Sequence, residues 1–206
     1  MPVTTEDVSE WIHAFADRVA DNKKHLTKLD SAIGDGDHGQ NMHRGLEAAR
    51  NSMDGSASPD ALLKSVAMAL ISKTGGASGP LYGTFFMDAG KAAPGDAIDL
   101  DGWASMMQAG LDGVVRRGKA EVGDKTMVDA MTPAVEVLHD ASANDTDLAT
   151  ALHQAARAAE EGMTATTPLI ARKGRASYLG ERSKGHQDPG ATSTYYLFAA
   201  AADALT

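Results

Sequence analysis

Apolar residues recur at helical spacing along almost the whole chain, and this periodicity limits the fold more than any other feature. Val8, Trp11 and Phe15, for example, lie on one helical stripe. No stretch of the sequence shows the two-residue alternation, bounded by hairpin turns, that predicts β-strands. The sequence therefore predicts an all-α fold of about eight amphipathic helices. The predicted helices cover residues 8–19, 42–53, 58–70, 82–93, 103–115, 127–141, 148–163 and 191–205.

Composition narrows the class of protein. The chain has 206 residues, enough for one buried core, and we expect a single domain over residues 1–206. It has no cysteine, which excludes disulfides, thiolate metal sites and a cysteine nucleophile. Its net charge of -9 argues against nucleic acid as a direct partner. Because no stretch approaches the ~20 apolar residues of a membrane span, and the N-terminus does not look like a signal peptide, we expect a cytoplasmic protein without membrane association.

Glycines gather in four connections between the predicted helices. These connections cover residues 34–39, 75–83, 118–126 and 172–190. In an antiparallel helical assembly, connections that are an even number of helices apart emerge at the same end. The sequence therefore predicts that all four meet at one rim, and we expect the functional site there.

The first connection contains three aspartates, Asp30, Asp35 and Asp37, within eight positions. Carboxylates this close repel one another unless a cation joins them, and oxygen ligands alone favour magnesium or calcium. A calcium-binding EF-hand is excluded because Gln40 and Leu46 stand where its glycine and its glutamate are required. The alternative without a metal is that these aspartates cap a helix and shape a turn.

The other three connections add weaker signals. Segment 75–83 offers successive backbone N–H groups ahead of a helix, which is typical of an anion site. Segment 118–126 is close to a phosphate-binding P-loop, but Asp124 interrupts the motif and a helix, not a strand, precedes it. Segment 172–190 is polar and basic. It is either a solvated surface loop or, as its length favours, a lid.

Four segments carry a more specific pattern. They read GDGDHGQNM (34–42), GGASGPLYGTFF (75–86), GDKTMVD (123–129) and GRASYLGERSKGHQDPGATS (174–193). Together they closely resemble the nucleotide-binding L subunit of dihydroxyacetone kinase, and the resemblance extends over essentially the whole chain. It implies a closed barrel of eight antiparallel helices that binds an adenine nucleotide, ADP or ATP, and two Mg²⁺ ions at one rim.

The resemblance also implies roles for individual residues. Asp30, Asp35 and Asp37 would bind the metal ions, and segment 172–190 would be the lid. Arg175 would stabilise charge during phosphoryl transfer, and His38 would donate a hydrogen bond to a phosphate; a phosphohistidine is the less favoured alternative. The residues expected around the nucleotide are His38, Asn41, Ser78, Gly79, Met127, Arg175, Asp188, Pro189 and Gly190.

The resemblance leaves two classes of function open. In the first, the chain is a phosphotransferase subunit that passes a phosphoryl group to a ketose held on a separate ketose-binding kinase subunit. The phosphoryl source would be a phosphocarrier protein of the phosphotransferase system, with ADP kept as a bound coenzyme, or else free ATP. In the second class, the chain is a nucleotide-sensing module that binds a transcription regulator. Both classes need the same pocket.

Overall fold

The computed structural model describes residues 2–53 and 58–206, and its regular secondary structure is helical. Over these residues it contains nine α-helices, one 3-10 helix and no strand; one isolated bridge joins Val3 to Ile98. The helices are α1 (Thr5–Asp21), α2 (Lys23–Ile33), α3 (His38–Arg50), α4 (Pro59–Lys73), α5 (Ser78–Lys91), α6 (Leu100–Gly118), α7 (Met127–Ala143), α8 (Leu148–Ala165), the 3-10 helix η1 (Arg175–Ser183) and α9 (Pro189–Ala204).

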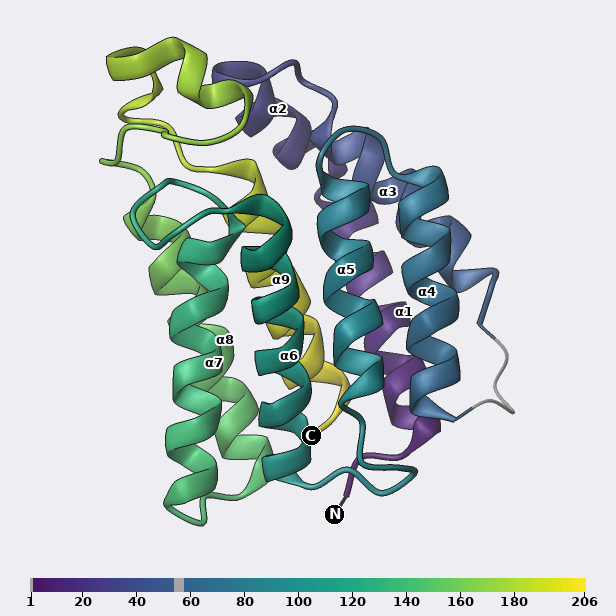
Figure 1. Ribbon diagram of the computed structural model, residues 1–206. Helices are drawn as coiled ribbons and strands as arrows, with labels where there is room; N and C mark the ends of the chain where they lie inside the picture. Colours follow the sequence, from purple (N-terminus) through teal and green to yellow (C-terminus); the bar gives the residue numbers. More distant parts are fainter. Residues whose placement is uncertain (1, 54–57) are drawn as a thin grey trace.

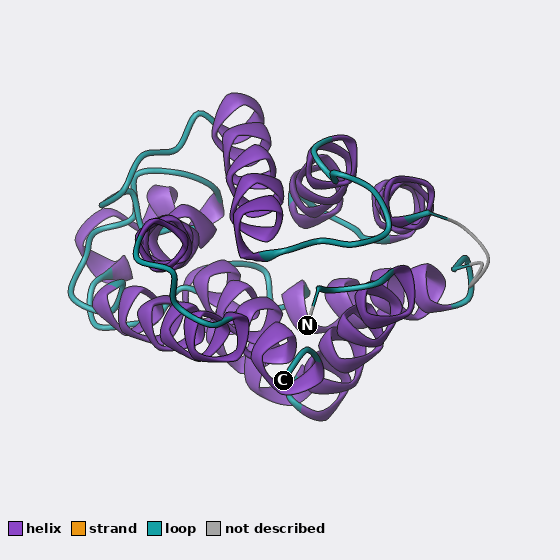
Figure 2. Ribbon diagram, turned by 90° about the horizontal axis from the view of Figure 1, so that it is seen from below, coloured by secondary structure: helices purple, strands orange, loops and turns teal. Residues whose placement is uncertain are grey.

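The long helices form an antiparallel ring, as the sequence predicted. Each of α1, α3, α4, α5, α6, α7 and α8 contacts the next long helix, and α9 contacts both α8 and α1. The ring is therefore closed. Both termini lie at the lower end, which Figure 2 shows from below, whereas the four glycine-containing connections lie at the upper end (Figure 1). The prediction of one common rim is confirmed.

Local capping explains where several helices begin. Thr4 and Asp7 form a reciprocal capping box at the start of α1, and Thr126 and Asp129 form another at the start of α7. The side chain of Asp188 accepts a hydrogen bond from the first turn of α9. Two of these three starts, those of α7 and α9, lie at the rim.

Aromatic residues fill the interior of the ring. Trp11 and Trp103 are fully buried and pack edge to face, with ring centroids 4.9 Å apart and planes inclined at 66°. The indole N–H of Trp11 donates to the backbone oxygen of Leu197 at 3.0 Å, which ties α1 to α9. Glycines let other helices approach closely: a Cβ on Gly162 of α8 would lie 2.3 Å from the backbone oxygen of Asp129 in α7.

The main departure from the sequence prediction is α2. Residues 23–33 were not among the predicted helices, yet they form three turns that lie across the upper end and contact η1 (Figure 1). Leu26 and Ile33 are buried, but most of the remaining surface of α2 is polar, so its apolar stripe is narrow. Among the described residues, no helix combines the length and the apolar character that a bilayer crossing requires.

Candidate functional site

A pocket of about 430 Å³ opens at the rim, between the starts of four helices. The first residues of α3, α5, α7 and α9 all line it; they are His38, Ser78, Met127 and Pro189. The N-terminus of a helix carries unpaired backbone N–H groups and a partial positive charge. Four such ends around one cavity make a site suited to an anion.

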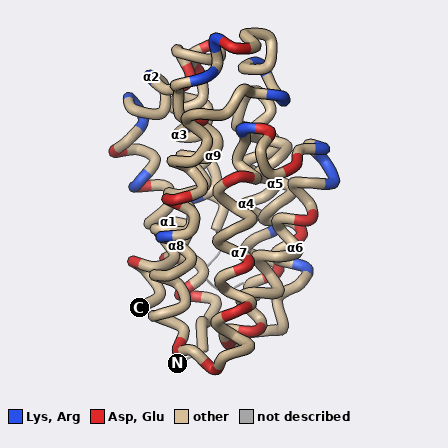
Figure 3. Tube along the Cα trace, turned by 90° about the vertical axis from the view of Figure 1, so that its left-hand side faces the viewer, with Lys and Arg blue, Asp and Glu red and all other residues tan. Residues whose placement is uncertain are grey.

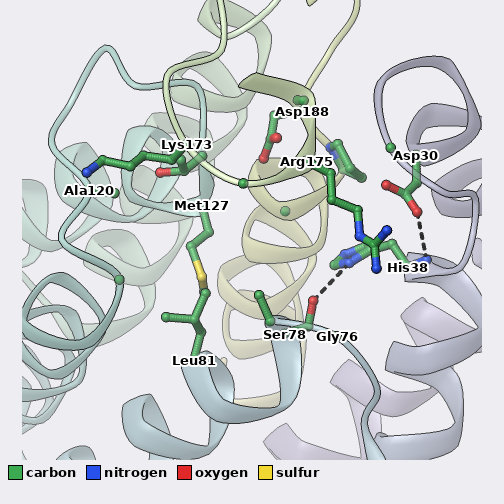
Figure 4. A pocket seen from close by; sticks show the side chains of 18 of the residues that line it. Asp30, His38, Gly76, Ser78, Leu81, Ala120, Met127, Lys173, Arg175 and Asp188 are labelled. Carbon is green, nitrogen blue, oxygen red and sulfur yellow. Dashed lines mark hydrogen bonds between the residues drawn. The ribbon is translucent and has the colours of Figure 1, made fainter. Parts of the chain in front are cut away.

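Three carboxylates face this pocket from one side. Asp30 lies in the last turn of α2 and is buried, whereas Asp35 and Asp37 lie in the exposed connection to α3. Each offers an oxygen, and these oxygens lie within 4.8 Å of one another. Oδ2 of Asp30 accepts a hydrogen bond from the backbone N–H of Asp37 at 2.8 Å. It accepts another from the backbone N–H of His38 at 3.1 Å, which Figure 4 shows. The buried carboxylate thereby folds the connection back over the end of α2.

Two glycines make this tight turn possible. Gly34 ends α2, and a Cβ at this position would lie only 2.1 Å from Oδ1 of Asp30. Gly36 has φ +76°, a left-handed conformation that side chains other than glycine rarely adopt. The turn therefore requires small residues on both sides of Asp35.

The donor set fits a magnesium site. All three groups are carboxylates, which are the ligands that hard cations prefer. One positive side chain offsets them: the guanidinium of Arg175 lies 3.0 Å from Oδ2 of Asp35, and this is the one ion pair formed by the triad among the described residues. A single arginine cannot balance three carboxylates, so the cluster can accept further positive charge.

His38 is buried beneath the triad and is engaged through both ring nitrogens. Nε2 lies 2.9 Å from Oγ of Ser193. Nδ1 lies 3.1 Å from Oγ of Ser78, a contact that Figure 4 shows. Burial lowers the pKa of His38 to about 4, although the negative charge of Asp30 opposes this change. The ring is therefore neutral at physiological pH, and one of its nitrogens must act as an acceptor. A hydrogen bond from His38 to a phosphate would have to replace one of these hydroxyl contacts.

The other predicted nucleotide residues differ in how they meet the pocket. Ser78, Met127, Pro189 and Gly190 line it directly. Gly79 and Asn41 lie behind the lining: a Cβ on Gly79 would lie 2.5 Å from the backbone oxygen of Thr74, and Asn41 accepts a hydrogen bond from Arg44 at 2.7 Å. Their positions indicate that they support the 74–77 connection from below.

Asp188 is the N-cap of α9 and is buried at the pocket wall. Its Oδ2 accepts from the backbone N–H of Ala191 at 2.7 Å. Burial raises the pKa of Asp188 to about 7, and the negative charge of Asp129 also raises it. The hydrogen bond from Ala191 and the positive charge of Lys125 lower the pKa, but they do not outweigh burial. A carboxyl group that changes charge near neutral pH therefore lies at the start of α9.

The opposite side of the pocket is apolar, and the sequence did not indicate this. Figure 4 shows Met127 and Leu81 side by side there, facing away from the carboxylates. Leu81 lies inside the glycine-containing segment 75–86, but only the fold brings it beside residues of α6 and α7. The apolar lining consists of Leu81, Val114, Ala120, Met127 and Val128.

Segment 172–190 covers the pocket from above, and η1 forms its outer part (Figure 1). Lys173, Gly174 and Arg175 of this segment line the cavity. Tyr178, farther along, is 87% exposed. In Figure 3 most Lys and Arg segments lie in the upper half of the molecule, so the basic residues of this acidic chain are concentrated towards the rim.

Comparison with known proteins gives a consistent result. Residues 32–203 match the DAK2 domain. The chain is 45% identical to the PEP-dependent dihydroxyacetone kinase 1, ADP-binding subunit DhaL, of Listeria innocua, over 91% of this chain and 90% of that protein. It is 44% identical to the corresponding PEP-dependent subunit of Escherichia coli, over 96% of this chain and 95% of that protein.

A solved structure shares the fold. It is the dihydroxyacetone kinase from C. freundii in complex with AMP-PNP and Mg²⁺, which matches with a TM-score of 0.72 and 26% identity. The match covers 98% of this chain but 34% of that one, so the present chain spans about a third of the solved kinase.

Proposed function

Because the chain belongs to the DAK2 domain family, we propose that it is the ADP-binding subunit of a dihydroxyacetone kinase, a phosphotransferase. It would pass a phosphoryl group from a phosphocarrier protein, by way of bound ADP, to a ketose held on a separate subunit. The observation that carries this proposal is the rim pocket, where three carboxylates face the N-termini of four helices. Residues 1–206 would act as one cytoplasmic nucleotide-binding domain, with segment 172–190 as its lid.

The two sides of the pocket suit the two parts of a nucleotide. The apolar side around Leu81 and Met127 would contact the base, and the helix starts around Ser78 would donate N–H groups to the phosphates. Asp30, Asp35 and Asp37 would hold two Mg²⁺ ions, which when bound neutralise phosphate charge and bridge phosphate oxygens.

Phosphoryl transfer depends mainly on positioning and charge stabilisation, so the chain needs no nucleophile of its own. Arg175 carries a permanent positive charge beside Asp35 and would stabilise the phosphoryl group during its transfer. His38 would act on Ser78 and the phosphates through hydrogen bonds, with no covalent step, because its neutral ring already contacts two hydroxyl groups. The remaining nucleotide residues, Asn41, Gly79, Asp188, Pro189 and Gly190, would shape the walls around it.

Two observations favour the phosphocarrier over free ATP as the phosphoryl source. Relatives named PEP-dependent or PTS-dependent subunits are 42–47% identical to this chain. Relatives named erythrulose kinases are 37–38% identical, and the chain spans 35% of their length.

Reconstitution tests the proposal. Alone, the purified chain should not phosphorylate dihydroxyacetone at an appreciable rate with Mg-ATP, because orientation of the second substrate supplies roughly 7–11 kcal/mol of barrier lowering. Adding a ketose-binding subunit and a phosphocarrier system supplied with phosphoenolpyruvate should give turnover without exchange of labelled ADP from solution.

Other outcomes point elsewhere. Exchange of the labelled nucleotide in every cycle would make ATP a substrate and the chain an ATP-dependent subunit. Tight ADP binding without turnover in either system, together with nucleotide-dependent binding to a transcription regulator, would support a sensing module. Rapid ketose phosphorylation by the chain alone would contradict the subunit assignment.

A further inference from the structure

Lys125 is buried in the rim, although lysine side chains are almost always exposed. It lies in the connection between α6 and α7 and is 1% exposed. Its backbone is left-handed, with φ +64°, which turns the side chain inward, below the lid. None of the roles described above for the nucleotide or the metal uses this residue.

The ammonium group of Lys125 is held by backbone carbonyl groups. Nζ donates to the oxygen of Thr166 at 2.7 Å, to that of Leu169 at 3.2 Å and to that of His186, and the oxygen of Thr167 lies farther away, at 3.4 Å. Thr166 and Leu169 lie between α8 and the lid, and His186 lies where the lid returns to α9. One ammonium group therefore joins the two bases of the lid.

Other contacts converge on the same place. The backbone N–H of Gly185 donates to Thr167 at 2.8 Å, and the N–H of Asp188 donates to Oγ1 of Thr166 at 3.0 Å. The N–H of Arg172 donates to the backbone oxygen of Asp124, beside Lys125, at 3.1 Å. Figure 1 shows the α6–α7 connection beside the segment that leads from α8 into η1. By contrast, the outer part of the lid, η1, contacts α2, and the ion pair between Arg175 and Asp35 joins it to the connection after α2, at the end of the lid nearest the pocket.

A positive charge is needed at this position. Carbonyl oxygens that point into one buried space repel one another, and a cation removes that repulsion. No carboxylate of the described residues lies within ion-pair distance of Nζ. Burial lowers the pKa of Lys125, while the negative charges of Asp188 and Asp129 raise it and so help to keep the ammonium group charged.

We propose that Lys125 is a positioning residue that fixes both bases of the lid to the α6–α7 connection, so that Lys173, in the first of these bases, is held at the pocket. The lid could then open and close through η1 while its bases stay in place. Met127, two residues after Lys125, lines the apolar side of the pocket. The contacts of Lys125 therefore also set the distance between the lid and that side. The anchoring of the lid by Lys125 does not depend on the proposed function. Only the benefit of that anchoring for phosphoryl transfer rests on it.

The test compares two lysines of one connection. Lys119 also has a left-handed backbone, with φ 54°, but its side chain is exposed, so Lys119→Met is the matched control for Lys125→Met. Without nucleotide, trypsin should cut Lys125→Met at the bases of the lid, after Arg172, Lys173 or Lys184, about tenfold or more faster than wild type, the change expected when one charged hydrogen bond is lost. Lys119→Met should be cut as wild type is. Equal cleavage of Lys125→Met and wild type would overturn the proposal.

Chemical rescue separates positioning from a general loss of stability. In Lys125→Ala, ethylammonium ions should restore slow cleavage of the lid, because the ammonium group can again bind the same carbonyl oxygens. Methanol, propanol or sodium chloride at matched concentration should not. A cleavage rate that ethylammonium leaves unchanged, while the helical circular dichroism stays at the wild-type level, would mean that the charged head is not what holds the lid.

A measurement on the wild-type chain covers the case in which the variants do not fold. Amide hydrogen exchange should be slow in residues 166–169 and 184–188, and much faster in residues 175–183. Equally fast exchange in all three segments would contradict fixed bases. Because none of these measurements uses ADP, they test Lys125 even if the chain binds no nucleotide, and ADP retention tests the proposed function independently.

Discussion

Replacing Asp188 with asparagine should make the chain more stable at alkaline pH and leave it nearly unchanged at acidic pH. Asparagine has the same shape as aspartate, and its side-chain oxygen can still accept the hydrogen bond from Ala191 that caps α9. The substitution therefore keeps the cap and removes only the ability of the group to ionise.

The structure sets the size of this effect. Burial raises the pKa of Asp188 from 3.8 to about 7 in the folded chain. In the unfolded chain the carboxyl group ionises from its ordinary pKa upward, whereas in the folded chain it stays protonated until near neutral pH. The stability that the protonated group provides is complete below the unfolded pKa and is lost as pH rises through the folded one. The full difference corresponds to about 4 kcal/mol of unfolding free energy.

Urea denaturation at a series of pH values, without Mg²⁺ or nucleotide, measures the effect. The unfolding free energy of Asp188→Asn minus that of wild type should increase by about 4 kcal/mol between about pH 4 and about pH 8. Asp147→Asn is the matched control, because Asp147 is the N-cap of α8 and is fully exposed. Hydrogen bonds from Thr150 lower the pKa of Asp147, so ionisation of Asp147 stabilises wild type, and the unfolding free energy of Asp147→Asn minus that of wild type should decrease as pH rises.

A constant difference between Asp188→Asn and wild type at all pH values would refute the reasoning. It would mean that the carboxylate is ionised in the folded chain, and that the positive charge of Lys125 and the N-terminus of α9 outweigh burial. A decrease at high pH, like that of the control, would lead to the same conclusion.

Three further predictions concern the metal site, the lid and the packing. Asp37→Asn should abolish Mg²⁺-dependent ADP binding in calorimetry and keep the helical content of wild type, since the helices pack independently of the site; unchanged affinity would mean that the metal assignment is wrong. Mg-ADP should slow tryptic cleavage at Arg175 or Arg182, because the basic lid gathers around an anion; equal rates with and without Mg-ADP would remove the lid role. Gly162→Ala should lower the unfolding free energy by about 1–3 kcal/mol, because its Cβ would lie 2.3 Å from a backbone oxygen of α7. Gly118→Ala, at the exposed end of α6, should be nearly neutral, and an equal loss in both variants would exclude the α7–α8 contact as the cause.

The sequence alone determined the class of fold and the end of the molecule at which the candidate site lies. Helical periodicity depends on the spacing of apolar residues along the chain, which is a local property, and it predicted an all-α protein. Antiparallel packing then requires alternate connections to share one end, so the common rim followed from the order of the helices. Asp30, Asp35 and Asp37 are close in sequence, and for that reason their proximity could also be predicted.

Tertiary structure decided the features that depend on distant parts of the chain. The narrow apolar stripe of α2 is weak as a local signal, and its helix is stabilised where it packs across the rim. Asp188 has an unusual pKa because the fold buries it beside Asp129. Lys125 looks in sequence like an exposed loop lysine, but carbonyl groups 41 and 61 residues away surround its ammonium group. Burial and long-range hydrogen bonds depend on which segments meet in space, and no local pattern of residues contains that information.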